Sequence, residues 1–131
     1  MYKKYIDLRI EGRLTRMDDY KFTVMWKNDV MADVELYDKR RKVRIKKYKN
    51  TFPENPFYGG EVTPERVYRF LEGRCMDRNR PCLPEYLKGL GLTEYNPYKI
   101  VKITHGVMWE DFQWLRFPGE EISWKDVKLR D

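Results

Sequence analysis

The sequence predicts an α+β fold, in which an N-terminal antiparallel β-meander of about four strands is followed by three short helices and a final strand. Three observations support this prediction. Apolar and polar residues alternate through much of the first fifty residues, as they do in strands buried on one face. Patterns with helical spacing, each opened by a proline, follow from residue 63 onward. The alternation then returns near residue 112, which indicates a last strand.

The meander is predicted from four alternating segments. The first lies within residues 3–10, and the Met17-Asp18-Asp19 turn follows it. The dipeptide Asn28-Asp29 is typical of a tight hairpin, and a second turn is expected at Asp38-Lys39. The apolar positions of the four segments are Ile6, Leu8 and Ile10, then Phe22, Val24 and Trp26, then Val30, Ala32, Val34 and Leu36, and finally Val43 and Ile45.

A connector is expected at residues 51–62, because two prolines and a Gly-Gly pair lie there among polar residues. The first helix is predicted over residues 63–73, with Thr63 as its N-cap and Pro64 in its first turn. The whole chain of 131 residues is interpreted as a single domain, long enough to bury a core without disulfides or metals. Its parts are the meander at 1–50, the connector at 51–62 and the helical part with the C-terminal strand at 63–131.

Two shorter helices are predicted next. Pro84 opens one that Gly91 can end in the left-handed conformation, and Asn96-Pro97 opens another with Gly106 at its C-cap. The residues expected to be buried are Leu83, Leu87 and Leu90 in the second helix, and Ile100, Val101 and Ile103 in the third. In the final strand, Phe112, Trp114 and Arg116 alternate with Gln113, Leu115 and Phe117. A short turn or helix can follow Ser123.

Composition excludes several classes of protein. The high aromatic content argues against disorder, and no stretch approaches the roughly 20 apolar residues of a membrane span. The N-terminus, MYKKYIDLRIEG, lacks the apolar core of a signal peptide, so a cytoplasmic protein without a membrane partner is expected. Two cysteines are too few for a disulfide framework, and we expect free thiols.

The net charge of +6 is placed unevenly. Residues 1–50 carry 15 Lys and Arg against 8 Asp and Glu, whereas residues 51–131 carry 12 against 13. Most of the excess lies in KRRKVRIKKYK, from Lys39 to Lys49. If residues 42–48 are extended, side chains of alternate residues point to opposite faces. One face would hold Val43, Ile45 and Lys47, and the other, continuously positive, would hold Lys42, Arg44, Lys46 and Tyr48.

Such a basic strand has two interpretations. It suits a phosphate backbone or another polyanion, because Arg binds phosphate oxygens bidentately and neutralised phosphates release counterions, and it also suits an acidic protein surface. It is equally typical of a solvated edge strand whose lysines prevent pairing with another sheet. On the first interpretation the candidate binding residues are Lys39, Arg40, Arg41, Lys42, Arg44, Lys46 and Lys47, with Arg78 and Arg80 as a second group.

A metal site is the minor alternative for the cysteines. Cys75 and Cys82, with His105 downstream, offer three soft ligands of the kind zinc prefers. Their spacing fits no common zinc motif, and a free cysteine is more often a small buried hydrophobe. No cofactor is therefore expected. The arginines near these cysteines, Arg74, Arg78 and Arg80, are interpreted as surface or loop anchors rather than a phosphate clamp.

His105 lies near Glu110 and Asp111, an arrangement that can support acid–base chemistry. The sequence has no second histidine, nucleophile elbow or glycine-rich phosphate loop. The absence of these motifs favours His105 as a capping group at the negative end of a helix dipole. Trp109 and Trp114 are interpreted as core or interface residues. A non-enzymatic protein is expected.

The segment from Phe70 to Phe117, with WKNDVMADVEL and NPF upstream, resembles a family of small proteins from Firmicutes and their phages and mobile elements. Members show a strand meander, a Pro-Phe loop, a helix ending in FLE-R-C, an Arg-containing loop, LGL--Y-P--I and THGVM--D--W. The resemblance covers about two thirds of the chain. The matching residues are Phe70, Leu71, Glu72, Arg74, Cys75, Arg80, Leu90, Gly91, Leu92, Tyr95, Pro97, Ile100, Thr104, His105, Gly106, Val107, Met108, Asp111 and Trp114.

The resemblance implies a function connected with mobile elements in bacterial cells. Small mobile-element proteins of this appearance include inhibitors of CRISPR effector nucleases, and some relatives accompany HipA-like kinase genes of toxin–antitoxin systems. We therefore expect a non-enzymatic, anti-CRISPR-like inhibitor in the bacterial cytoplasm. It would bind a type II CRISPR effector nuclease, or its guide RNA or DNA, and block DNA loading or cleavage. The basic charge departs from inhibitors that mimic DNA with acidic residues.

Two further alternatives stay open. The chain can instead be an accessory or antitoxin component of a toxin–antitoxin module that binds nucleic acid. It can also form a homodimer if strands near residues 2–10 pair between copies, although pairing within one sheet fits the same residues equally well.

Overall fold

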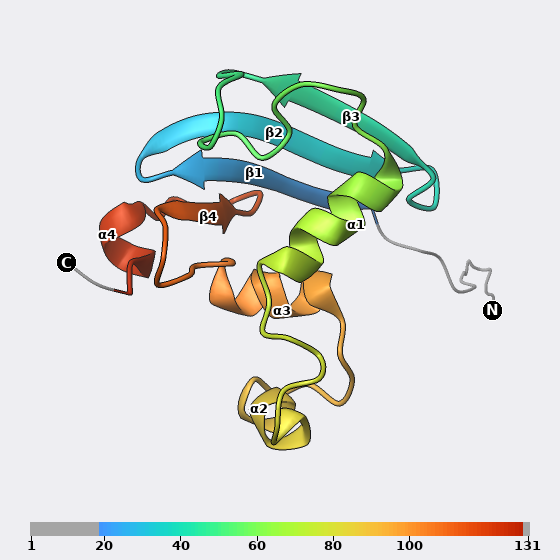
Figure 1. Cartoon of the computed structure of the whole chain (residues 1–131), viewed down its shortest axis with the longest axis vertical. Helices are drawn as coiled ribbons and strands as arrows, with labels where there is room; N and C mark the ends of the chain where they lie inside the picture. Colours follow the sequence, from blue (N-terminus) through green and yellow to red (C-terminus); the bar gives the residue numbers. More distant parts are fainter. Residues whose placement is uncertain (1–18, 130–131) are drawn as a thin grey trace.

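The computed structural model describes residues 19–129, and it confirms the α+β class with an N-terminal meander (Figure 1). The strand predicted at residues 3–10, and the pairing between copies considered there, lie outside the described residues. The elements are β1 (Tyr20–Trp26), β2 (Asp29–Tyr37), β3 (Lys42–Lys47), α1 (Pro64–Gly73), α2 (Leu83–Gly89), α3 (Pro97–Thr104), β4 (Gln113–Arg116) and α4 (Trp124–Val127).

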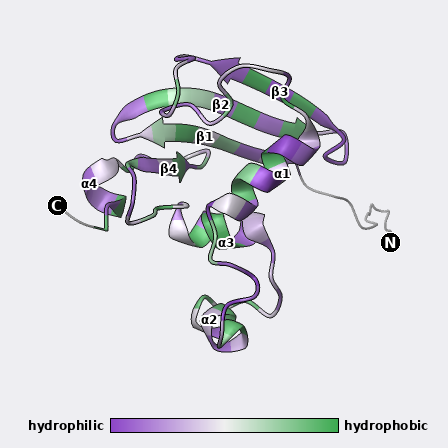
Figure 2. Ribbon diagram, viewed as in Figure 1, coloured by the Kyte–Doolittle hydropathy of each residue, from purple (hydrophilic) through white to green (hydrophobic). Residues whose placement is uncertain are grey.

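The strands form one antiparallel sheet in the order β3-β2-β1-β4, so β4 from the C-terminal part completes the N-terminal meander. The register pairs Val34 with Ile45, and Val24 with both Ala32 and Leu115. Because side chains alternate along a strand, this register collects the apolar residues on one face. Figure 2 shows the alternation of hydropathy along the strands. The buried strand residues of the main core cluster are Tyr20, Phe22, Val24, Met31, Ala32, Val34, Leu36 and Leu115.

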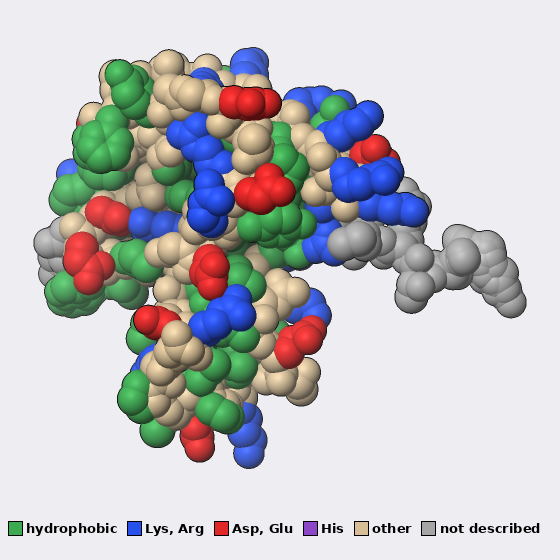
Figure 3. All heavy atoms as spheres, turned by 45° about the vertical axis from the view of Figure 1, so that its right-hand side comes forward, with side chains coloured by type: hydrophobic (Ala, Val, Ile, Leu, Met, Phe, Trp, Pro, Cys, Tyr) green, Lys and Arg blue, Asp and Glu red, His purple; other side chains and the backbone are tan. Residues whose placement is uncertain are grey.

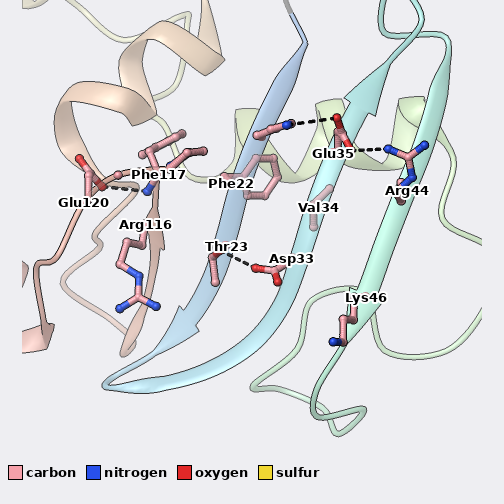
Figure 4. A pocket seen from close by; sticks show the side chains of 13 residues that line it. Phe22, Thr23, Asp33, Val34, Glu35, Arg44, Lys46, Arg116, Phe117 and Glu120 are labelled. Atoms are coloured by element: carbon pink, nitrogen blue, oxygen red, sulfur yellow. Dashed lines mark hydrogen bonds and ion pairs between the residues drawn. The ribbon is translucent and has the colours of Figure 1, made fainter.

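Helices α1 and α3 contact each other and cover the apolar face of the sheet (Figures 1 and 4). The Thr63 side chain accepts a hydrogen bond from the Arg66 N–H at 3.2 Å, so the predicted cap of α1 is confirmed. Ile100 and Val101 of α3 are fully buried. The prediction that Ile103 is buried with them is wrong, because its side chain is 46% exposed. At about 100° per residue, Ile103 points away from the direction that Ile100 and Val101 share.

The ends of the predicted turns and helices differ slightly from expectation. The β1–β2 turn is formed by Lys27 and Asn28, one residue earlier than predicted. The C-cap of α3 is His105 with φ +60°, and Gly106 follows with φ +64°. Gly91 lies one residue beyond the C-cap of α2 with φ +79°, as its predicted left-handed role requires.

The connector contributes to the core, which its loop-like composition does not indicate. Phe57 is fully buried and packs with its ring centroid 5.1 Å from that of Phe70. Asn55 is also fully buried, where its side chain accepts a hydrogen bond from the Phe57 N–H at 3.0 Å. This local turn directs the aromatic ring inward. The Asn-Pro-Phe sequence therefore has a structural role in this fold.

Candidate functional site

Strand β3 carries the basic residues as the alternation predicts. Lys42, Arg44 and Lys46 are exposed, whereas Val43 and Ile45 are partly buried against the core. β3 is an edge strand, which pairs with β2 on one side only. Because Val43 and Ile45 face the core, Lys42, Arg44 and Lys46 point to the opposite face of the sheet, where they can meet a partner.

Cross-strand register extends this basic surface over the whole sheet. Thr23 pairs with Arg116 of β4 and with Asp33 of β2, and Asp33 pairs with Lys46. In a second row, Glu35 pairs with Lys21 and Arg44. In Figure 4, α1 lies behind the sheet and these side chains lie in front of it. We call this surface the open face, defined by Lys21, Thr23, Asp33, Glu35, Arg44, Lys46 and Arg116.

The open face is not uniformly positive, because the central strand β2 supplies two carboxylates. Glu35 lies 2.6 Å from the Arg44 guanidinium and 3.6 Å from the Lys21 ammonium. Asp33 accepts hydrogen bonds from the Thr23 hydroxyl at 2.6 Å and the Tyr48 hydroxyl at 2.7 Å. This hydrogen bond to Asp33 raises the pKa of Tyr48 above its usual value. The carboxylates thus lie between cations of β1 and β4 on one side and of β3 on the other.

Two cations of the open face have no carboxylate partner among residues 19–129. They are Lys46 and Arg116, at opposite ends of the row that crosses all four strands. The Lys46 ammonium lies 5.0 Å from the centre of the Tyr48 ring. Within the described part of the chain, its charge and that of Arg116 are therefore available to a bound anion.

A groove of about 410 Å³ lies over the open face. Its floor is the sheet, and the segment from Arg116 to Glu120, with Pro118 and Gly119, forms one wall (Figure 4). Arg44 and Lys46 stand at the opposite side. The groove therefore has cations on both sides and the carboxylates of β2 between them.

Lys39, Arg40 and Arg41 lie in the β2–β3 turn, apart from the open face. Figure 3 shows Lys and Arg side chains gathered over this end of the sheet. Asp38 lies 3.1 Å from Arg41 and 3.8 Å from Lys42, and the hydrogen bond from Arg41 lowers the pKa of Asp38. The Arg40 guanidinium lies 4.3 Å from the centre of the Tyr20 ring, and its Nε is buried without a hydrogen-bond partner among the described residues. Arg40 therefore packs on the core side, whereas Lys39 is exposed in the turn.

The remaining candidates also fall outside the open face. Lys47 lies on the Val43 and Ile45 side of β3. Arg78 and Arg80 lie in the α1–α2 loop, which Figure 1 places far from β3. Arg78 pairs with Glu72 at 3.1 Å and its guanidinium lies over the Tyr95 ring, while that of Arg80 lies over Tyr86.

The three soft-ligand residues have different surroundings in the described structure. Cys75 is buried, and burial raises the pKa of its thiol to about 12, whereas Cys82 is exposed. Both cysteines are free, as predicted. His105 Nε2 lies 2.9 Å from Glu120 Oε2. Within residues 19–129 no group of three His, Cys, Asp or Glu side chains is arranged to hold a metal ion.

The network around Arg74 is not expected from the sequence. This residue follows α1, is only 8% exposed, and donates to the Gly106 and Gln113 carbonyl oxygens at 2.8 and 2.7 Å. It also forms a bidentate pair with Asp111 at 2.8 and 3.0 Å. The network joins the end of α1 to the Thr-His-Gly turn and to β4. Its partners lie at least 32 residues away in the chain, so local patterns do not reveal it.

Sequence reasoning also missed Lys21 and Arg116 on the open face. Each is a single cation in a mostly apolar strand, whereas the candidates expected from the sequence lie in the charge run on β3 and in the loop with Arg78 and Arg80. The pairing of β4 with β1 brings Arg116 into the same row as Lys46. The outward position of Arg116 in the predicted last strand was the available signal.

Comparisons with protein-family models, curated proteins and solved structures found no match for this chain. In the part of the chain that the structure describes, no helix has the length and apolar character needed to cross a membrane. The geometry of the open face is therefore the basis for a functional proposal.

Proposed function

We propose that the protein is a non-enzymatic binding protein that contacts an anionic partner through the open face of its sheet. One observation carries the proposal. Helices α1 and α3 cover only one side of the sheet, and the other side exposes a groove flanked by cations. Among residues 19–129, two of these cations, Lys46 and Arg116, have no carboxylate partner.

A phosphate backbone fits this surface. Arg and Lys bind phosphate oxygens, and each neutralised phosphate releases counterions, so affinity falls as salt rises. Asp33 and Glu35 reduce the net positive charge of the groove. We therefore expect binding that is moderate in strength and strongly dependent on salt, rather than very tight at physiological salt.

The residues that suggested chemistry have roles in the fold, which supports a non-enzymatic function. The Cys75 thiol, with its pKa raised to about 12, stays protonated at neutral pH and is a poor nucleophile. Its Sγ donates to the Leu71 carbonyl oxygen at 3.3 Å. His105 forms the C-cap of α3 and contacts Glu120.

The narrower proposal is an anti-CRISPR-like inhibitor that acts in the cytoplasm of a bacterial host. It binds a type II CRISPR effector through the guide RNA or the target DNA, and it blocks DNA loading or cleavage. This part rests on the family resemblance of residues 70–117. The open face supplies the kind of surface that contact with the nucleic acid of such a complex would need.

Capture by a purified type II effector, with and without guide RNA, tests the proposal. The test variant is Lys46→Glu with Arg116→Glu, and the control is Lys88→Glu with Lys125→Glu, two exposed cations on α2 and α4 with the same charge change. We expect guide-dependent capture that the open-face variant loses and the control retains.

Other outcomes would redirect the proposal. Capture of the open-face variant at the wild-type level would rule out this surface as the contact. Capture without guide RNA would instead indicate contact with the effector protein. Binding to free DNA, with no binding to the effector, would favour the toxin–antitoxin alternative.

A further inference from the structure

We infer that the open face binds single-stranded nucleic acid, with phosphates on the cations of β3 and a base stacked on Tyr48. The inference rests on the proposed function and names the class of anion that the same surface takes. It depends on two features beyond charge: where the carboxylates lie, and how the Tyr48 ring is held.

The carboxylates restrict the path of a phosphate backbone. Asp33 and Glu35 both lie on β2, so a backbone that crosses the sheet would pass over two negative charges. A backbone along β3 would meet Lys42, Arg44 and Lys46 instead. Lys42 and Arg44 lie in exposed pairs with Asp38 and Glu35, in which phosphate can replace the carboxylate. Alternate residues of a strand are about 6.7 Å apart, a spacing at which an extended single strand can place one phosphate on each cation.

Tyr48 is placed to stack on a base beside this path. It follows β3 directly, and its side chain is held by a hydrogen bond from its hydroxyl to Asp33 and by the Lys46 ammonium near its ring. Even so, 49% of the residue is exposed. An exposed ring that is fixed at both ends loses little freedom when a base stacks on it. Aromatic rings beside cationic grooves are the usual platforms for single-stranded nucleic acid.

A second cation–aromatic pair lies along the same strand. The Arg44 guanidinium lies 4.3 Å from the centre of the Tyr37 ring on β2. A guanidinium plane also stacks on bases, so Arg44 can contact either a phosphate or a base. Two cations of β3, Arg44 and Lys46, thus each lie against a tyrosine ring, and a polyanion without bases would make no use of these rings.

Duplex nucleic acid fits the surface less well. A duplex keeps its base faces inside the helix, so it can use the cations of β3 but gains nothing from Tyr48. In a single strand the exposed bases can extend over β2, where carboxylate oxygens accept hydrogen bonds from base amino groups. The Asp33 and Glu35 side chains then face bases rather than phosphates.

Fluorescence anisotropy with labelled RNA and DNA single strands of about 12 nucleotides tests the inference. The same sequence as a duplex, and a labelled heparin fragment, provide anions without accessible bases. The key variant is Tyr48→Leu, with Tyr48→Phe to keep the ring but remove its hydroxyl. Tyr58→Leu is the matched control, because Tyr58 is 51% exposed and lies in the connector. Circular dichroism verifies that each variant is folded.

We expect Tyr48→Leu to weaken single-strand binding about fivefold or more and duplex or heparin binding less than twofold. Tyr48→Phe, which keeps the ring but loses the hydrogen bond to Asp33, should weaken single-strand binding less than Tyr48→Leu does. Tyr58→Leu should leave single-strand binding within about twofold of wild type. Equal losses for all ligands, or none, would overturn base stacking. Equal wild-type affinity for heparin, duplex and single strand would overturn the inference and leave the proposed anion contact intact. If wild-type protein binds none of these ligands, the proposed function fails too.

Discussion

Two arginine–carboxylate pairs of this protein have similar distances and different surroundings. Arg74 lies 2.8 Å from Asp111, and Arg44 lies 2.6 Å from Glu35. The Arg74 side chain is 7% exposed, whereas that of Arg44 is 64% exposed. Arg74 also donates to two backbone carbonyl oxygens, which hold it between α1 and β4. Arg44 has an aromatic ring beside it and otherwise faces solvent.

Burial and fixed acceptors, rather than distance, decide what an ion pair does. Exposed pairs contribute about 0–1 kcal/mol, because water and salt compete with the partner. A phosphate can therefore replace the carboxylate of an exposed pair with little loss of folding stability. Removal of one member of a buried pair leaves the other charge without a partner and costs about 3–5 kcal/mol. An exposed pair such as Arg44–Glu35 therefore suits ligand binding, whereas a buried pair such as Arg74–Asp111 suits a fixed contact between elements of the fold.

The largest effect is expected from Arg74→Ala. It should lower the free energy of unfolding by about 3–5 kcal/mol, because the Asp111 carboxylate loses its guanidinium partner and the Gly106 and Gln113 carbonyl oxygens lose a donor. Urea denaturation at neutral pH measures the change. Arg78→Ala is the control, since Arg78 forms an exposed pair with Glu72 and should cost less than about 1 kcal/mol. Equal losses in the two variants would contradict the distinction between buried and exposed pairs.

A smaller loss of stability is expected from Gly106→Ala, because Gly106 lies in the turn that accepts a hydrogen bond from Arg74. Gly106 has φ +64°, and an added Cβ would lie 3.3 Å from the Arg74 Cβ. We expect a loss of about 1–3 kcal/mol in unfolding free energy. Gly89→Ala on α2 is the matched control, because a Cβ there has no neighbour within 4 Å and alanine favours a helix. A neutral Gly106→Ala would mean that the turn can relax away from Arg74.

The difference in burial between Cys75 and Cys82 predicts a difference in thiol reactivity. Burial raises the pKa of Cys75 to about 12, so a thiol reagent at pH 8 should label Cys82 alone until the protein unfolds. Labelling of one thiol in the native state and two in denaturant, measured by mass spectrometry, is the expected result. Native labelling of Cys75 at the rate of Cys82 would show that this region opens readily.

Ionisation of the Cys75 thiol also makes the free energy of unfolding depend on pH. The unfolded chain ionises Cys75 near the ordinary value of 9.0, while the fold keeps it protonated up to about pH 12. The stability that the neutral thiol contributes is therefore complete below pH 9 and decreases as the pH rises from 9 toward 12. The same direction holds for Tyr20, Tyr86 and Tyr95, whose pKa values burial also raises. A Cys75→Ala variant should show a weaker decrease in urea titrations across this range.

The sequence predicted local structure well and long-range contacts poorly. Prolines, caps and alternation located β1, β2, β3 and the helices, because each of these signals acts within a few residues. The partners of Arg74 were missed, since Gly106 and Asp111 come near it only after α1 and α3 pack together. The basic character of β3 was predicted, but the carboxylates opposite it depend on the register of β2. Two of the seven residues that define the open face, Arg44 and Lys46, were thus predicted from one strand, and the other five required the sheet.

The smallest expected effect is the coupling between Arg44 and Glu35. A double-mutant cycle with Arg44→Ala and Glu35→Ala, measured by urea denaturation, should give about 0.2–1 kcal/mol at low salt. The Debye length falls from about 30 Å at 0.01 M salt to about 3 Å at 1 M, so this coupling should nearly vanish at high salt. The loss from Arg74→Ala should persist there, because water and ions do not reach a side chain that is 7% exposed. A coupling of several kcal/mol at high salt would identify Arg44 as part of the scaffold. Its guanidinium would then be unavailable for phosphate, and the cations left on the open face for binding would be Lys21, Lys46 and Arg116.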